Sequence, residues 1–219
     1  MKVLIFGASG MVGQGVLREC LLDPEVTDVI SIGRSPSGKS HPKLRELIHR
    51  DLYDYSSIES ELIGIDACFF CLGVSSLGMK EAEYARISYD MTLAAATVLA
   101  RLNPNMVFTY VSGAGTDSTE QGAVMWTRVK GRTENALLAL PLRAYMLRPG
   151  AIQPLHGVRS KTALYQFFYT LATPIFPLLR AIAPNQITTT EQVGKAMLIL
   201  AKRGNDKKVL ESKDIATLR

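Results

Sequence analysis

The stretch KVLIFGASGMVGQG, residues 2–15, decides the fold class of this chain. Its first five residues have a strand-like, mostly apolar pattern, and three glycines then follow at G-x-x-G-x-x-G spacing. Gly7 permits a tight turn, Gly10 lets the backbone approach a pyrophosphate, and Gly13 lets helix and strand pack closely. Free N–H groups at the start of the next helix would bind the phosphates. The pattern predicts a dinucleotide-binding loop; a tight turn without a ligand is the alternative.

Strand-like and helix-like patterns alternate along the rest of the chain. Strands are predicted at 2–6, 26–32, 47–50, 66–72, 106–112, 143–148 and 207–212, and helices at 11–22, 56–62, 80–102, 121–140 and 190–202. This alternation with apolar strands indicates an α/β fold, with a parallel sheet covered by helices on both faces. Because no linker divides the chain, we expect one domain over 1–219. Its irregular segment 151–189 is expected to form a substrate-side cap over the carboxyl edge of the sheet.

Composition excludes several classes of protein. The chain has 219 residues, of which 47% are hydrophobic, and this suits one globular core. Its formal charge is +5, but the basic residues are scattered, so nucleic acid is not expected as a partner. An odd number of cysteines and an apolar run at 3–6 that is too short for a signal-peptide core favour a reducing compartment. We therefore expect a cytoplasmic location.

One long segment carries no charge. Residues 162–179 read TALYQFFYTLATPIFPLL, and a membrane span needs about 20 apolar residues. Gln166, Pro174 and Pro177 interrupt the run, which favours a partly buried helical element over a span. This surface could face an apolar ligand, a protein partner or the membrane surface.

The segment after the second strand bears on cofactor choice. An NAD-binding site would place an acidic residue there to bind the ribose hydroxyls. The chain instead has GRSPSGKS at 33–40, where Arg34 and Ser35 fit a 2′-phosphate and no carboxylate repels it. We therefore expect NADP(H) in preference to NAD(H), although Arg34 could also be a solvated loop charge. Asp51 and Leu52, after the third strand, are placed to lie along the adenine.

Four groups of residues carry a resemblance to a known family. They are GASGMVG (7–13), FFCLGVSS (69–76), VSGAG followed by MWTRVKGRTE (111–115 and 125–134), and LRPGAI (147–152). The sequence resembles the atypical branch of the short-chain dehydrogenase/reductase superfamily, and is most similar to the Tat-interacting-protein-like oxidoreductases. The similarity covers nearly the whole chain and implies a Rossmann-type doubly wound sheet in three layers. It also implies further cofactor contacts at Ser9, Met11, Val12, Cys71, Leu72 and Gly73.

The same resemblance implies a catalytic mechanism with three side chains. A tyrosine moves the proton on the substrate oxygen, a lysine one turn later holds the nicotinamide ribose, and a serine binds the same oxygen. Lys130 matches the lysine, Trp126 stands at the tyrosine position, and Gly113 stands at the serine position with Ser112 beside it. An indole N–H donates a hydrogen bond but does not titrate, so Trp126 cannot do the tyrosine's chemistry. Trp126 could equally pack as an ordinary half-buried aromatic.

Two functions therefore stay open. The first is an NADP-dependent oxidoreductase or epimerase-type enzyme acting on a small or apolar substrate, with Tyr84, Tyr89, Thr127 or an ordered water as the acid. Isomerisation or dehydration with the hydride kept on the cofactor would need the same acid. The second is a non-catalytic protein that senses NADP(H) and engages a partner. The sequence leaves monomer and homodimer open.

No metal site is expected. Cys68 and Cys71 stand three apart on a predicted strand, so their side chains point to opposite faces and are interpreted as buried apolar thiols. His41, His49 and His156 lie far apart in the sequence and form no ligand pattern.

Overall fold

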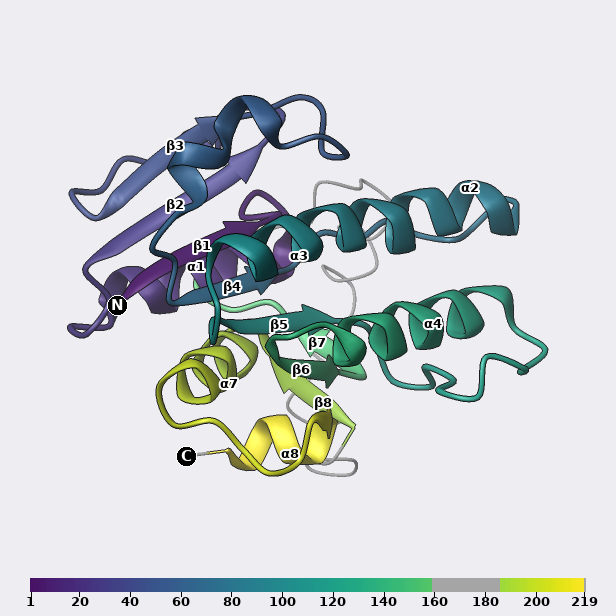
Figure 1. Cartoon of the computed structure of the whole chain (residues 1–219). Coiled ribbons are helices and arrows are strands. Elements are labelled where there is room, and N and C mark those ends of the chain that lie inside the picture. Colours follow the sequence, from purple (N-terminus) through teal and green to yellow (C-terminus); the bar gives the residue numbers. More distant parts are fainter. Residues whose placement is uncertain (159–185, 219) are drawn as a thin grey trace.

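A parallel sheet forms the centre of the molecule, with seven strands among the described residues (Figure 1). The computed structural model describes residues 1–158 and 186–218. The strands are β1 (Lys2–Phe6), β2 (Asp28–Gly33), β3 (Leu44–Ile48), β4 (Ala67–Phe70), β5 (Val107–Val111), β6 (Arg143–Arg148) and β9 (Val209–Glu211). Their order is β3-β2-β1-β4-β5-β6-β9, and each neighbouring pair is parallel. This confirms the Rossmann-type doubly wound sheet.

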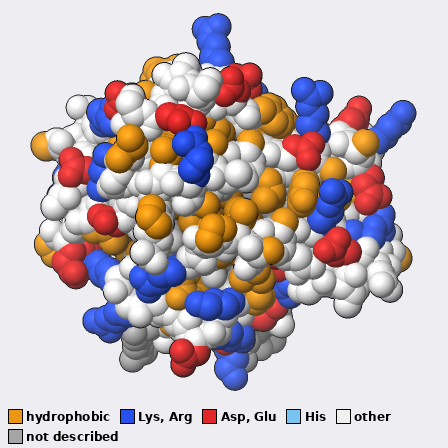
Figure 2. Space-filling model, viewed as in Figure 1, with side chains coloured by type: hydrophobic (Ala, Val, Ile, Leu, Met, Phe, Trp, Pro, Cys, Tyr) orange, Lys and Arg blue, Asp and Glu red, His pale blue; other side chains and the backbone are white. Residues whose placement is uncertain are grey.

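Helices cover both faces and give three layers (Figure 1). One face carries α1 (Met11–Leu22), α7 (Thr190–Arg203) and α8 (Ser212–Thr217). The other carries the 3-10 helix η1 (Ser56–Leu62), α2 (Glu81–Ala85), the π-helical turn η2 (Arg86–Asp90), α3 (Met91–Leu102) and α4 (Met125–Ala139). Each face buries its own hydrophobic core, because alternate residues of the strands point to opposite sides. Over the face with α3 and α4, hydrophobic side chains gather across the middle (Figure 2).

Several elements differ from their sequence predictions. The helix expected at 80–102 contains the π turn Arg86–Asp90, and the helix expected at 121–140 begins only at Met125. Its start is delayed because the Asp117 carboxylate accepts backbone N–H groups of residues 119, 121 and 122, which holds this segment in turns. The short helix α8 was not expected.

The segment expected to be an irregular cap is partly regular. Its ends form β7 (Ala151–Gln153) and β8 (Ile187–Thr189), which pair in parallel as a second, two-stranded sheet. The uncharged segment 162–179 lies outside the described residues. No helix in the described ranges is long and apolar enough to cross a membrane.

The strand order reverses beside β1. The connection from β1 leads to β2 on one side, whereas β4 lies on the other. In doubly wound sheets, ligands bind at such a switch point, outside the carboxyl ends of the strands. We therefore expect a ligand site among the loops after β1, β2, β4 and β5.

Candidate functional site

A continuous groove follows the carboxyl edge of the sheet. It consists of two cavities of about 460 and 600 Å³. Both are lined by Gly10, Met11 and the segment 71–75 after β4, so one cavity continues into the other. We call the first cavity the adenosine side and the second the nicotinamide side, after the ends of the dinucleotide that the fold would place there.

The glycine loop has the close contacts that its spacing predicted. Gly7 has φ +79°, and a Cβ there would lie 2.8 Å from the carbonyl carbon of Cys71. A Cβ on Gly13 would lie 2.1 Å from the Gly7 oxygen, so only glycine lets α1 start this close to β1. No side chain of the described residues caps α1, and its first turn has no acidic residue. The helix therefore presents N–H groups and a positive dipole end to the groove, which fits phosphates.

Further residues of the loop and of the segment after β4 also border the groove. Ser9 lines the adenosine side, and Val12 lines the nicotinamide side. Cys71, Leu72 and Gly73 line both cavities, so the segment after β4 borders the place where the two halves meet. All residues of these two segments that were expected to contact the cofactor therefore border the groove, except Gly13. Gly13 instead allows α1 to pack close to the loop after β1.

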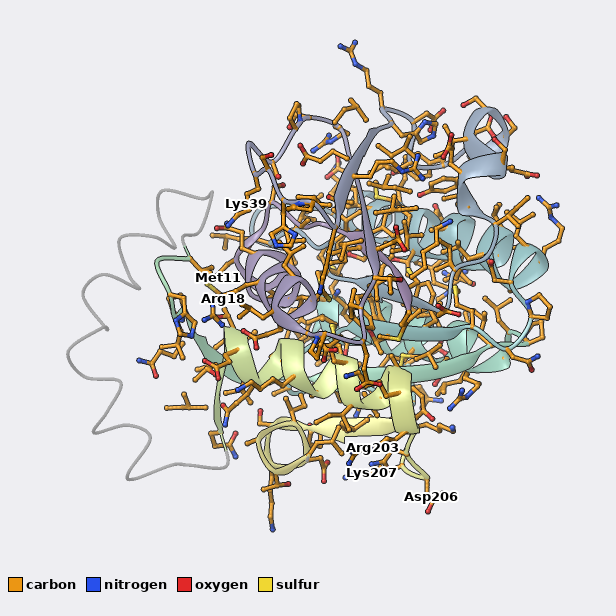
Figure 3. The ribbon with its side chains drawn as sticks, turned by 90° about the vertical axis from the view of Figure 1, so that its left-hand side faces the viewer. Met11, Arg18, Lys39, Arg203, Asp206 and Lys207 are labelled. Atoms are coloured by element: carbon orange, nitrogen blue, oxygen red, sulfur yellow. The ribbon has the colours of Figure 1, made fainter. Side chains whose placement is uncertain are left out.

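The loop after β2 forms the end of the adenosine side. Arg34, Ser35 and Ser37 line the cavity, and Arg34 is exposed. The Ser37 N–H donates to the Glu46 carboxylate at 2.7 Å, which fixes the loop to β3. Lys39, from the same loop, lies toward the side of the molecule that also carries Met11 (Figure 3). The positive charge here suits a phosphate on the ribose.

Of the two residues expected along the adenine, the structure brings only one to the cavity. Leu52 is buried and lines the adenosine side. Asp51 is exposed and is not among the lining residues; its carboxylate accepts the Tyr53 N–H at 2.9 Å. The Asp51 side chain thus holds the local turn, and its contact with the adenine stays a prediction.

Lys130 lies on the nicotinamide side. It is 5% exposed, and its Nζ donates to the Tyr110 hydroxyl at 2.8 Å and to the Val111 carbonyl at 3.3 Å. Burial lowers the pKa of Lys130 to about 8, against a smaller opposing effect of the Glu134 carboxylate. A buried ammonium whose hydrogen bonds go to neutral groups is suited to meet a polar ligand.

Ser112 does not have the geometry expected of a substrate-binding serine. Its hydroxyl lies 2.5 Å from Glu134 Oε1 and 3.1 Å from the Leu147 carbonyl oxygen, and both are acceptors. Glu134 is 1% exposed and forms an ion pair with the partly buried Arg148. The Ser112 proton is therefore directed to this network, although the residue borders the cavity.

Trp126 and Gly113 lie beside each other. Trp126 is half-buried and lines the nicotinamide side. Gly113 has φ +145°, and a Cβ there would lie 3.8 Å from Trp126 Cζ3. The indole thus packs over the loop after β5, and this backbone would strain a serine at position 113.

Only one of the alternative acids among the described side chains reaches the groove. Tyr84 is 3% exposed and lines the nicotinamide side. The Arg132 guanidinium carbon lies 4.1 Å from the centre of the Tyr89 ring, and Tyr89 lines neither cavity. The Thr127 hydroxyl donates to the Val124 carbonyl at 2.8 Å, and Thr127 also lines neither.

Sequence reasoning missed Tyr110 and Glu134. Both could have been found by spacing, because Tyr110 precedes Ser112 by two residues on a strand and Glu134 follows Lys130 by one helical turn. The adenosine side likewise includes Ser31 and Ser37, which no motif marked.

The cysteines form no metal centre with the other described residues. No group of three or more His, Cys, Asp or Glu side chains in the described ranges could hold a metal ion. Cys20, Cys68 and Cys71 are free thiols. Burial raises the pKa of each, so they are poor nucleophiles.

Comparison with curated proteins finds fungal relatives. The chain is 31% identical over 159 residues to Protein fmp52, mitochondrial, of Emericella nidulans, covering 69% of this chain and 66% of that protein, just under two thirds of its length. It is 25% identical over 213 residues to Protein FMP52, mitochondrial, of Candida albicans, covering 93% and 89%. The expectation of a cytoplasmic location is contradicted, because these relatives are named as mitochondrial proteins.

Solved structures show the same fold at low sequence identity. MoeE5 in complex with UDP-glucose and NAD superimposes with a TM-score of 0.69 at 16% identity, covering 96% of this chain and 75% of that chain. The dTDP-glucose 4,6-dehydratase DesIV from Streptomyces venezuelae, solved with NAD and TYD, has a TM-score of 0.69 at 13% identity, covering 95% and 74%. An oxidoreductase of the short chain dehydrogenase/reductase family from Burkholderia thailandensis has a TM-score of 0.69 at 16% identity, covering 100% and 94%.

The family model described as NAD dependent epimerase/dehydratase family matches residues 3–124. This range contains the glycine loop, the loop after β2 and the segment after β4, which together form most of the groove. The fold and the match agree with the resemblance to atypical short-chain dehydrogenases/reductases. The chain belongs to the NAD dependent epimerase/dehydratase family.

Proposed function

We propose that this protein binds NADP(H) in the groove and acts as an oxidoreductase or epimerase-type enzyme on a small or apolar substrate. One observation carries the proposal: a single groove joins an uncapped, glycine-lined helix start to the buried Lys130. The cofactor, when bound, supplies or accepts a hydride at the nicotinamide. The protein's part is to hold it and to position the substrate.

Each part of the groove suits one part of the cofactor. The start of α1 would bind the pyrophosphate, while Arg34 and Ser35 would bind a 2′-phosphate. Lys130 would hold the nicotinamide ribose, and Trp126 would form a wall of the substrate space. Several solved neighbours contain NAD, so the preference for NADP(H) rests on Arg34 and on the lack of a carboxylate in residues 33–40.

Fluorescence titration tests this proposal directly. Trp126 is the only tryptophan of the chain and lines the nicotinamide side, so its emission should respond to a bound nicotinamide. We expect tighter binding of NADPH than of NADH. Equal affinity would contradict the role of Arg34, and failure of both cofactors to bind would refute the proposed function.

A second function is favoured by the altered catalytic positions. Trp126 cannot titrate, and the Ser112 hydroxyl is directed to Glu134, so a non-catalytic protein that reports the NADP(H) state to a partner also fits the site. Tight cofactor binding without turnover of any carbonyl compound would favour this alternative. Contact with a partner or a membrane surface through residues 162–179, and the choice between monomer and homodimer, stay predictions.

A further inference from the structure

We propose that Tyr84 moves the proton to and from the substrate oxygen, and so does the work that Trp126 cannot do. The inference rests on the proposed function, because it requires a carbonyl or alcohol substrate beside the nicotinamide. It deepens that function by assigning the acid/base to α2, a different helix from the one that carries Trp126 and Lys130.

The position of Tyr84 fits this task. It borders the same cavity as Lys130 and Trp126, and it is the only tyrosine among the described residues that line this cavity. The start of α2 is tied to α4 by an ion pair in which Arg128 donates to Glu81 at 2.6 Å. The helix that carries the phenol is thereby held against the helix that carries the lysine.

Ionisable groups from three elements lie beside the phenol or in the cavity that it borders. Tyr110 on β5 lies close to Tyr84, and the charge of a Tyr84 phenolate would raise the pKa of Tyr110. Lys130 on α4 donates a hydrogen bond to the Tyr110 hydroxyl at 2.8 Å. Glu134 on α4 acts on Lys130 and Tyr110, and Cys71 after β4 lines the cavity. The Lys130 ammonium is the one cation within this group, and it borders the same cavity as Tyr84.

The π turn next to Tyr84 provides a second observation. Ser88 lies within this turn, one helical turn after Tyr84. Burial raises the pKa of the Tyr84 phenol, and the nearby Ser88 hydroxyl lowers it by a smaller amount. The Ser88 Oγ is buried and makes no well-formed hydrogen bond to any described residue. Buried hydroxyls are nearly always partnered, and π turns inside α-helices often mark functional sites. The Ser88 hydroxyl is therefore free to donate a hydrogen bond to the phenol oxygen of Tyr84.

The proton transfer balances in the direction of reduction. As the substrate carbonyl carbon receives a hydride from the dihydronicotinamide cofactor, the Tyr84 Oη–H bond breaks and an O–H bond forms at the substrate oxygen. The electron pair of the broken bond stays on Tyr84 as phenolate. The phenolate then takes a proton from solvent in the cavity that Tyr84 lines, and oxidation follows the reverse course.

A spectroscopic experiment tests the proposal without turnover. The near-ultraviolet absorbance of tyrosinate is titrated against pH for the protein alone and for the protein saturated with NADP⁺, with binding verified by Trp126 fluorescence. The positive nicotinamide favours a nearby phenolate, so one tyrosine should ionise at lower pH in the complex. Tyr84→Phe should remove this NADP⁺-dependent transition. Tyr89→Phe, the matched control outside the groove, should keep it.

The outcomes for Tyr84 and for cofactor binding can be told apart. If NADP⁺ binds but no tyrosine shifts, or if the shift persists in Tyr84→Phe, the role of Tyr84 is refuted while cofactor binding stands. If NADP⁺ and NADPH do not bind to the folded wild-type protein, both proposals fall.

Kinetics provide the second measurement, with para-nitrobenzaldehyde and NADPH as the probe pair. Tyr84→Phe should lower kcat by about 100-fold or more, with little change in NADPH affinity. Adding Trp126→Tyr to Tyr84→Phe should restore part of the activity, since it returns a phenol one turn before Lys130. Wild-type kcat in Tyr84→Phe would overturn the proposal.

Discussion

The adenosine side and the nicotinamide side of the groove are built from different parts of the chain. The adenosine side rests on backbone geometry, with Gly7 and Gly13 allowing close approach and α1 offering uncapped N–H groups. The nicotinamide side rests on side chains, among them Lys130, Trp126 and Tyr84. The first half has the glycine spacing of a dinucleotide loop, and the second has Trp126 and Gly113 where the resemblance implies a tyrosine and a serine.

The difference shows which part of such a site tolerates change. A backbone-made phosphate site requires small residues at a few positions and is otherwise indifferent to side chains. A catalytic set requires particular side chains at particular distances, but a group from another helix can reach the same space. We therefore expect substitutions on the adenosine side to affect binding, and substitutions on the nicotinamide side to affect chemistry.

The largest expected effect comes from Gly13→Ala. Because the new Cβ would lie 2.1 Å from the Gly7 oxygen, helix and strand must separate. We expect a loss of about 3 kcal/mol in unfolding free energy and loss of cofactor binding, measured by urea denaturation and fluorescence. Gly73→Ala is the stability control, since a Cβ there meets no described atom within 4 Å. Equal stability of the two variants would contradict the predicted close approach.

Lys130→Met should increase the free energy of unfolding and weaken cofactor binding on the nicotinamide side. Burial disfavours the ammonium, so the folded pKa of about 8 lies below the usual 10.5. The unfolded chain then binds more protons between these values, and the contribution of Lys130 to stability rises with pH across this window. Below pH 8 we expect the variant to be more stable by roughly 2 kcal/mol, with weaker cofactor binding. A stability difference that does not depend on pH would contradict this account.

Arg34→Ala should change cofactor choice and leave the fold intact. A charge-assisted hydrogen bond to the 2′-phosphate would be lost, which corresponds to roughly a ten-fold weaker affinity for NADPH. NADH has no such phosphate, so its affinity should hardly change. Lys39→Ala, in the same exposed loop, is the control for general charge. A similar loss for both cofactors would show that Arg34 acts on the shared part of the dinucleotide.

Asp117→Asn should have the smallest effect. Hydrogen bonds from Thr119 and from backbone N–H groups, including that of Gly122, lower the pKa of Asp117 to about 2. A lowered folded pKa means that the carboxylate contributes stability above its unfolded pKa of 3.8, and that this contribution is lost as pH falls toward 2. The variant should therefore show a slightly weaker acid dependence of thermal unfolding. An unchanged acid profile would mean that the turn before α4 does not depend on this carboxylate.

Much of the sheet and of the phosphate loop could be predicted from local patterns. Apolar runs such as residues 2–6 and 106–112 mark buried strands, and the glycines after the first strand mark its tight turn. The helix boundaries were less accurate. The late start of α4 depends on hydrogen bonds that Asp117 makes to the following turns, and periodicity does not reveal them.

The sequence by itself determined the order of the strands and helices along the chain, the glycine loop and the spacing of Trp126 one helical turn before Lys130. These features follow from periodicity and from residue identity at fixed spacing, which are local properties of the chain. Only the tertiary structure decided that Ser112 is directed to Glu134, that Asp51 is outside the groove and that Tyr84 is inside it. Those outcomes depend on how α2 and α4 pack on the sheet, because packing brings together side chains that are far apart in the sequence.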